Sequence, residues 1–245
     1  MDDTHGLQFW RATELDQAHP GGRATGVAKP ALEWPYEEAA LLPLPPPDLA
    51  LPPLDFHALM TERRTLRTYS REPLSLSQLS FLLWCSQGVT QHTPGARTLR
   101  TVPSAGACHA FETLLLVNNV ADLTPGLYRF VATRHALTKA AVDAEAQENL
   151  RDSFRNLHLV TLSAVVFLWV ADVARMTWQF GTRGWRYLLL DAGHICQNLH
   201  LAADVCGCGA CSIGVFDDTD ANAVLGLDGV TRMLVYAAAV GRKPV

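Results

Sequence analysis

Proline is distributed unevenly along this chain, and its distribution limits where a regular fold can form. Nine of the 14 prolines fall within the first 54 residues, and six of these nine are crowded into positions 43–47 and 52–53. Proline fixes its own φ angle and removes a backbone donor, so helix interiors and central strands do not tolerate such spacing. The sequence therefore predicts an extended N-terminal arm over residues 1–54 and a folded domain over residues 55–245.

Leucines alternate with the prolines of this arm, as at Leu42, Leu44 and Leu51. Such a segment could be a proline-rich ligand for another domain, or a strap on an apolar surface of its own protein. The alternation favours the strap, because the leucines would need an apolar surface to cover them.

The bulk composition is that of a globular protein. Of the 245 residues, 49% are hydrophobic, which is enough for a sizeable core. A formal net charge of −4 provides no basic field for nucleic acid or for an anionic membrane. The longest apolar run, 159–171, is shorter than the roughly 20 residues that a membrane-spanning helix needs. The first thirty residues contain no secretory signal, so we expect a cytoplasmic protein.

Hydrophobic periodicity and turn residues predict an alternation of helices and strands after residue 54. Helices are expected over 55–62, 75–88, 143–154, 184–205 and 217–225. Strands are expected over 112–119, 127–132, 136–140, 160–170 and 233–240, with a strand or turn over 210–216 and a hairpin formed by 127–140. Residues 89–100 are polar and are expected to form a loop. Mixed strands and helices with a hairpin favour an α+β sandwich.

Two of the predicted elements are unusually apolar. Residues 160–170 are almost continuously apolar, which is typical of a strand covered on both faces. Residues 184–205 have few charges, which predicts a helix buried nearly all round. A helix this apolar often lies in a subunit interface.

Arg63, Arg64, Thr65 and Arg67 place three arginines and a hydroxyl within five residues, in a chain where only 18% of residues are charged. Arginine offers a planar fork of donors that fits phosphate and keeps its charge, which suggests that this segment holds an anionic group. A solvated helix end is the alternative, because arginines also favour the negative pole of a helix.

Three further features extend this pattern. A basic pair, Arg242–Lys243, lies near the other end of the chain, and small residues form turns at 103–107 and 212–215. Small residues let the backbone approach a ligand closely. Together these residue types suit a phosphorylated aromatic cofactor, with cations for the phosphate and bare amides for the ring.

Other chemistries lack their motifs. The sequence contains no Gly-x-x-x-x-Gly-Lys loop, no Gly-x-Ser-x-Gly turn and no His-Glu-x-x-His helix. Cys206, Cys208 and Cys211 could bind zinc with Cys196 and either His194 or His200, but structural zinc sites usually use two separated pairs of ligands. Buried small residues at a helix end explain the cysteines better, so we expect no metal.

A series of short motifs runs in order from about residue 54 to residue 243. They are Arg63-Arg64-Thr65-Leu66-Arg67-Thr68-Tyr69, Pro73, Leu76, Gln78-Leu79, Leu82-Leu83-Trp84, Gly88, Arg100-Thr101-Val102-Pro103-Ser104-Ala105-Gly106, His109, Glu112, Gly126-Leu127-Tyr128, His135, Arg183-Gly184-Trp185-Arg186-Tyr187, Ala192-Gly193-His194, Gln197-Asn198-Leu199, Ile213-Gly214, Phe216-Asp217-Asp218, Tyr236 and Val240-Gly241-Arg242-Lys243. In these motifs the sequence resembles the nitroreductase family of FMN-dependent oxidoreductases, and within it the SagB-type dehydrogenase branch.

The resemblance implies a three-layer α+β sandwich with a mixed, mostly antiparallel sheet, built as an intertwined homodimer with FMN at the subunit interface. It implies that Arg63, Thr65 and Arg67 hold the phosphate and ribityl chain, with Arg64 contributing by its backbone or its side chain. Arg242 would close the phosphate end. It further implies cofactor contacts from two other segments: Pro103, Ser104 and Ala105 from the partner subunit, and Ile213, Gly214 and Val215 along the ring, with the amides of Gly214 and Val215 facing flavin N5 and O4.

Two departures bear on activity. Ala107 stands where general nitroreductases usually carry Asn, and in lacking this Asn the sequence resembles the SagB-type branch. Gln179 and Phe180 stand where azoline dehydrogenases of that branch carry a Lys-Tyr pair, and neither can act as a base, which argues against heterocycle oxidation by that mechanism. The catalytic residues therefore stay unassigned. His109, His135 and His194 are candidates for ring or substrate contact, although a buried structural histidine is commoner.

We therefore expect an FMN-dependent oxidoreductase that passes electrons between a reduced donor, such as NAD(P)H, and a small-molecule or peptide substrate. The alternative is an inactive member that serves as a scaffold or partner subunit of a peptide-modifying complex. A weaker possibility is a protein that acts on flavin itself.

Overall fold

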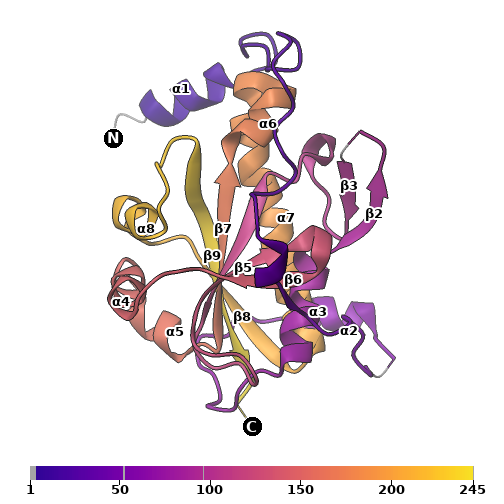
Figure 1. Cartoon of the computed structure of the whole chain (residues 1–245), viewed down its shortest axis with the longest axis vertical. Coiled ribbons are helices and arrows are strands. Elements are labelled where there is room, and N and C mark those ends of the chain that lie inside the picture. The colour runs from indigo at the N-terminus through magenta and orange to yellow at the C-terminus, as the bar shows by residue number, and fades with distance from the viewer. Residues whose placement is uncertain (1–3, 52, 96, 245) are drawn as a thin grey trace.

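A seven-stranded sheet runs through the middle of the protein in the order β1-β6-β5-β4-β7-β9-β8 (Figure 1). The computed structural model describes residues 4–51, 53–95 and 97–244. Every pair of neighbouring strands in this sheet is antiparallel. Among the residues described, a parallel pairing occurs only as an isolated bridge between Leu74 and Val120. The strands are β1 Leu42–Pro43, β4 Phe111–Val117, β5 Gly126–Val131, β6 Ala136–Lys139, β7 Val165–Asp172, β8 Cys208–Ile213 and β9 Arg232–Arg242.

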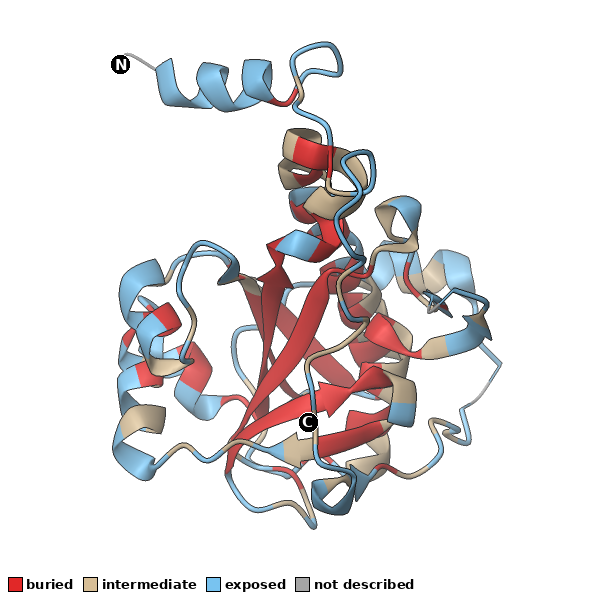
Figure 2. Cartoon of the chain, turned by 45° about the horizontal axis from the view of Figure 1, so that its top comes forward, coloured by how far each residue is buried: buried red, intermediate tan, exposed pale blue. Residues whose placement is uncertain are grey.

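Alternate side chains of the central strands enter two separate cores, one on each face of the sheet. In β7, Phe167 and Trp169 join the core shared with α3 (Leu76–Gln87) and α7 (Gly184–Val205). The intervening Val166 and Leu168 join the core shared with α4 (Ala144–Asp152), α5 (Leu157–Leu162) and α8 (Asp218–Val224). Helices thus cover both faces, and the predicted three-layer α+β architecture is confirmed (Figure 2).

Short polar side chains start the helices where the sequence predicts them. Ser75 accepts a hydrogen bond from the Gln78 amide while the Gln78 side chain bonds the Ser75 amide, which forms a capping box on α3. Asp55, Asp143 and Asp217 cap α2 (Phe56–Glu62), α4 and α8 by a single bond, since each side chain accepts from a backbone amide in the first turn of its helix. These caps satisfy backbone donors at helix starts that have no partner within the helix.

Two predictions of secondary structure in the folded domain are wrong. Residues 89–100 form a hairpin, β2 (Val89–Thr93) with β3 (Arg97–Arg100), instead of a loop. The strand expected over 160–170 begins only at Val165, because the first part of the apolar run folds as α5 and ends at Ser163. Both errors arise because apolar content alone does not separate a short helix from a strand, and polar hairpins carry little periodicity.

The N-terminal arm lies on its own protein, as the strap hypothesis states. β1 pairs with β6 at the edge of the sheet, Leu44 is buried, and the Ser80 hydroxyl donates to the Pro45 carbonyl. The arm is not extended throughout, however. Residues Thr4–Ala12 form helix α1, which projects from the body with no buried residue (Figures 1 and 2).

Helix α7 has the predicted bounds, but it is not buried all round. Leu189 and Leu190 are 56% and 53% exposed, and they begin a stripe of exposed residues that includes Gly193, His194 and Gln197. A 22-residue helix with this partly apolar stripe has one face that the single chain leaves uncovered. No helix in the described residues is both long and apolar enough to cross a membrane.

Candidate functional site

A cavity of about 260 Å³ lies between α7, the segment that follows α2, and the paired strands β8 and β9. Its lining contains two of the predicted cofactor residues, Arg63 and Thr65. The other lining residues are Gly193, Cys196, Gln197, His200, Ser212 and Tyr236. None of these side chains is acidic, and burial raises the pKa of the Cys196 thiol to about 12, so that thiol is neutral at physiological pH.

Close backbone packing fixes the segment after α2 against the strands. The Leu66 amide donates to the Ala210 carbonyl, and a Cβ at Gly209 would stand 2.4 Å from the Leu66 side chain. The Tyr69 hydroxyl donates toward the carbonyls of Leu66 and Ala239, and a Cβ at Gly241 would stand 2.6 Å from the Tyr69 ring. Both glycines are therefore required for residues 66–69 to lie flat on the sheet.

The predicted cations lie along this segment but have different partners. Arg63 is half-buried beside His200. Burial, and then the charge of Arg63, lower the pKa of that histidine. Arg67 lies beside Cys211, where its charge opposes the rise in the thiol pKa that burial causes. Arg64 turns away, because its Nη1 atom donates to the carbonyls of Thr61 and Arg63 at the end of α2. Its side chain thus caps α2.

Arg242 lies beside the same segment, although it is far away in the sequence. The Ser70 amide donates to the Arg242 carbonyl, and Arg242 Nη1 lies 2.9 Å from Glu72 Oε2 in an exposed ion pair. Arginines from the two ends of the folded domain therefore meet at one edge of the molecule. An exposed pair of this kind is weak and can exchange its carboxylate for another anion.

The end of β8 offers free backbone donors. Ile213 is buried in the strand, whereas Gly214 and Val215 are exposed beyond it. Within the described part of the chain, the amides of Gly214 and Val215 donate no hydrogen bond outside regular elements. Two adjacent amides without acceptors can hydrogen-bond a ligand at this point.

The turn of Pro103, Ser104 and Ala105 is held by α7. The Ser104 hydroxyl donates to Asp191 Oδ2 at 2.5 Å, and the Ala105 amide donates to Asp191 Oδ1. The same hydroxyl accepts from the His109 amide. Because its single proton is used by Asp191, the Ser104 side chain can offer a ligand only an acceptor, and any donor at this turn must be a backbone amide.

This turn and the cavity lie on opposite sides of α7. Successive residues of an α-helix are about 100° apart, so Asp191 points away from Gly193, Cys196 and His200, which line the cavity. The turn therefore cannot contact a ligand in the cavity of its own chain. It reaches such a ligand only if it belongs to a second copy.

Gln179 and Phe180 end helix α6 (Val173–Phe180), beside this turn. Phe180 packs edge-on against Tyr187 with ring centres 4.8 Å apart, and a Cβ at Gly106 would stand 2.9 Å from the Phe180 ring. The Gln179 side chain accepts a hydrogen bond from Arg23 of the arm. Neither side chain can donate or accept a proton as a catalyst.

The candidate histidines have structural surroundings. His109 is buried, and burial together with Arg100 lowers its pKa to about 3. His135 bonds the Ser80 hydroxyl at 2.7 Å in the strap contact. His194 lies on the exposed stripe of α7, 3.9 Å from Asp191. Within the described ranges, no three His, Cys, Asp or Glu side chains form a group that could hold a metal ion.

Sequence reasoning missed most of the lining that α7 contributes. Gly193, Cys196, Gln197 and His200 follow each other at intervals of three, one and three residues, which places them on one helix face. That spacing was present in the sequence. Asp191 was also missed, because its role depends on a turn 86 residues away in the chain.

Comparison with known proteins agrees with this architecture. The profile of the nitroreductase family matches residues 60–242. A protein of Methanocaldococcus jannaschii that is assigned as a nitroreductase is 31% identical over 185 residues, which cover 76% of this chain and 89% of that protein.

Solved structures share the fold. A structure from Anabaena variabilis, also assigned as a nitroreductase, is 28% identical with a TM-score of 0.64; the match covers 76% of this chain but only 37% of that one. A nitroreductase-type structure from Desulfovibrio desulfuricans in complex with FMN is 20% identical with a TM-score of 0.54, covering 77% and 86% of the two chains.

A more distant match is the Escherichia coli microcin synthetase McbBCD complex with truncated pro-MccB17 bound. It is 19% identical with a TM-score of 0.61, and the match covers 82% of this chain and 77% of that one.

The sheet order, the cavity beside α7 and the extent of the family match lead to one assignment: this chain belongs to the nitroreductase family, whose members are FMN-dependent and catalyse oxidation and reduction.

Proposed function

We propose that this protein is an FMN-dependent oxidoreductase that acts as a homodimer, with each flavin bound in the cavity beside α7. The observation that carries the proposal is the cavity itself, which has cationic and hydroxyl groups at one end and unpaired backbone amides next to it. The residues fit the cofactor, since the cavity lining has no acid to repel a phosphate and the buried His200 Nδ1 atom has no partner among the described residues.

The phosphate and ribityl chain are held by Arg63, Thr65 and Arg67, with Arg242 at the phosphate end. The guanidinium groups neutralise the phosphate, and Arg242 exchanges its exposed partner Glu72 for it. Arg64 contributes by its backbone alone, because its side chain caps α2.

Ile213, Gly214 and Val215 at the end of β8 would hold the ring of bound FMN, and the amides of Gly214 and Val215 would supply hydrogen-bond donors to its N5 and O4 atoms. Bound FMN supplies hydride acceptance and donation, and the protein supplies position and hydrogen bonds. Donors fixed at the place where charge develops stabilise the transition state without reorganisation. Tyr236 and Ser212 also line the cavity and place two hydroxyl groups in its wall.

The homodimer is supported by exposed apolar side chains around the cavity. Leu189 and Leu190 on α7, and Phe56 and Met60 on α2, are between 48% and 64% exposed. Burying them against a second copy would also bring the partner's Pro103–Ala105 turn to the cavity that its own chain cannot reach. In the dimer each site therefore uses both chains.

The electron donor is a reduced nicotinamide, NADH or NADPH, and the acceptor is a small molecule or a peptide. Membership of the SagB-type branch is supported by Ala107, by the motif order and by the likeness to the McbBCD complex. A cytoplasmic location is supported by six free cysteines, because thiols persist in reducing compartments.

The test is to purify the full chain and record its visible spectrum before and after denaturation. Wild-type protein should be yellow and should release FMN. Arg63→Ala with Arg67→Ala should be colourless, whereas Arg134→Ala, which removes an exposed arginine on the β5–β6 connection, should stay yellow. Wild-type protein that is colourless and takes up no added FMN would sink the proposal.

A second candidate, a non-catalytic scaffold subunit, is favoured by Gln179 and Phe180, which offer no acid or base beside the turn. The two candidates differ in one measurement. Bound FMN that is bleached by NADH or NADPH and recoloured by an acceptor supports the enzyme. Bound FMN that neither nicotinamide donors nor dithionite can reduce supports the scaffold.

A further inference from the structure

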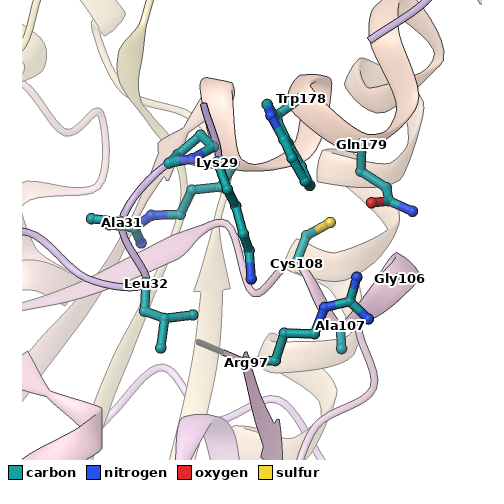
Figure 3. A pocket seen from close by; sticks show the side chains of 11 residues that line it. Lys29, Ala31, Leu32, Arg97, Gly106, Ala107, Cys108, Trp178 and Gln179 are labelled. Carbon is teal, nitrogen blue, oxygen red and sulfur yellow. The ribbon is translucent and has the colours of Figure 1, made fainter. Parts of the chain in front are cut away.

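A second, much smaller cavity lies where the N-terminal arm crosses helix α6 and the Gly106–Cys108 turn. Its volume is about 20 Å³, room for one or two water-sized groups. Figure 3 shows the arm residues Lys29, Ala31 and Leu32 on one side and Cys108, Trp178 and Gln179 on the other. This cavity is separate from the one beside α7, because the two share no lining residue.

Arg175 lines this cavity and is only 5% exposed. Its Nη2 atom donates to Glu112 Oε1 at 2.7 Å in a buried ion pair. Its Nε and Nη1 atoms are buried and have no hydrogen-bond partner among the described residues. Leaving donors of a buried charged group unsatisfied costs about 1–3 kcal/mol or more, so an acceptor that is not part of the chain is required there.

Two more cations reach the same cavity. Lys29, whose Nζ donates to the Gly95 carbonyl at 3.0 Å, comes from the arm, and Arg97 comes from the β2–β3 hairpin (Figure 3). Burial, and then the charge of Arg97, lower the pKa of Lys29. A negative charge between the two side chains would remove that repulsion.

The cavity wall supplies no negative charge of its own. The other lining residues are Pro30, Ala31, Leu32, Gly106, Ala107, Cys108, Trp178 and Gln179, none of which is acidic. The Cys108 thiol is neutral at physiological pH, because burial, with Asp191 nearby, raises its pKa to about 11. Three cations thus line a cavity that has no acidic residue in its lining. The two carboxylates near Arg175, those of Glu112 and Asp172, both approach its Nη2 atom, which leaves Nε and Nη1 without an acidic partner among the described residues.

We propose that this cavity is a binding site for a small anion no larger than a carboxylate group, held by Arg175, Lys29 and Arg97. The anion has two possible sources: a free inorganic ion, or the carboxylate of the acceptor substrate. The second source rests on the proposed function, in which the neighbouring Pro103–Ala105 turn reaches the partner's flavin. Because Lys29 belongs to the arm, the arm takes part in anion recognition as well as in fold stability.

The first test needs no flavin. Unfolding of the purified full chain is followed while formate, chloride or bromide replaces the bulky anion 2-morpholinoethanesulfonate at constant ionic strength. The midpoint should rise saturably with each small anion. Lys29→Gln with Arg97→Gln should weaken the apparent affinity at least tenfold, whereas Arg155→Gln, an exposed arginine elsewhere, should leave it unchanged. Crystals grown in bromide should show an anomalous peak within hydrogen-bond distance of Arg175.

The anion site is overturned if the unfolding midpoint depends on ionic strength alone, or if the small anions raise it equally in the wild type and in the double variant. Water would then be the partner of Arg175. The same holds for bromide crystals without the peak.

The second test separates the sources, using flavin-loaded protein with 4-nitrobenzoate and 4-nitrobenzamide as acceptors. If the substrate carboxylate binds here, the KM should be lower for 4-nitrobenzoate than for 4-nitrobenzamide. The ratio of these two KM values should move toward one in the Lys29→Gln, Arg97→Gln variant. Formate should compete with 4-nitrobenzoate but not with 4-nitrobenzamide. Equal KM values together with a positive anion titration assign the site to a free ion. If the protein binds no FMN, the proposed function fails while the anion titration still decides the site.

Discussion

The ion pair between Glu112 and Arg175 should be among the most costly contacts to break in this protein. Its side chains are 3% and 4% exposed, and the two atoms lie 2.7 Å apart. Removing one partner of a buried pair costs about 3–5 kcal/mol, because the remaining charge is left uncompensated. Glu112→Gln keeps one acceptor oxygen, and Asp172 stays 3.8 Å from Arg175, so we expect a loss of about 3 kcal/mol. For a chain of this length, that corresponds to a melting temperature lower by about 6–12 °C.

Scanning calorimetry and urea unfolding at one fixed protein concentration measure this loss, since self-association would add stability by mass action. Glu148→Gln is the matched control. It removes the charge from a carboxylate that is 62% exposed and pairs with Arg151 at 3.1 Å, and it should cost little. Equal losses in the two variants, or a loss below about 1 kcal/mol for Glu112→Gln, would refute the reasoning that burial sets the cost.

Three further predictions concern the arm, a helix start and pH. Gly181→Ala should release the arm and speed its cleavage in limited proteolysis, because Gly181 has φ +56° and its Cβ would stand 1.7 Å from the His19 carbonyl oxygen. Ser75→Ala should cost about 1 kcal/mol in urea unfolding, because it removes the capping box of α3, and Ser75→Asp should recover most of it. Unfolded histidine takes up a proton near pH 6.5, but buried His109 does so only near its lowered pKa of about 3. The free energy of unfolding should therefore fall as the pH drops below 6.5, by up to about 1.4 kcal/mol per pH unit for this group. His109→Gln should flatten this dependence of stability on pH, whereas His158→Gln, at an exposed position, should not.

The elements that the sequence predicts well carry their own local signals. Helix α3 has a capping box, α8 has an aspartate cap, and the hairpin of β5 and β6 has a turn between two apolar runs. The first and last residues of α7, Gly184 and Val205, were also predicted. In each case the information lies within a few residues of the element, so no knowledge of the tertiary structure is needed.

The features that the sequence does not predict depend on distant partners. Val160 in α5 and Val166 in β7 are both apolar and enter the same core, so apolar character does not tell the helix from the strand. The sequence leaves open whether Arg64 contributes by its backbone or its side chain, because the side chain's hydrogen bonds to the Thr61 and Arg63 carbonyls appear only when the end of α2 is folded. Asp191 has an ordinary place in an apolar helix, and its role appears only when the turn at Ser104 is folded against it.

The two-sided use of α7 has a genetic consequence in the proposed dimer. A chain with a substitution at Arg63 has a damaged cavity but an intact Pro103–Ala105 turn. A chain with a substitution at Asp191 has an intact cavity but a damaged turn. Co-expressing the two would generate mixed dimers in which one site inherits both faults and the other inherits neither. Two variants that are each colourless when expressed alone would thus give yellow, FMN-containing protein when expressed together, with one intact flavin site in each mixed dimer.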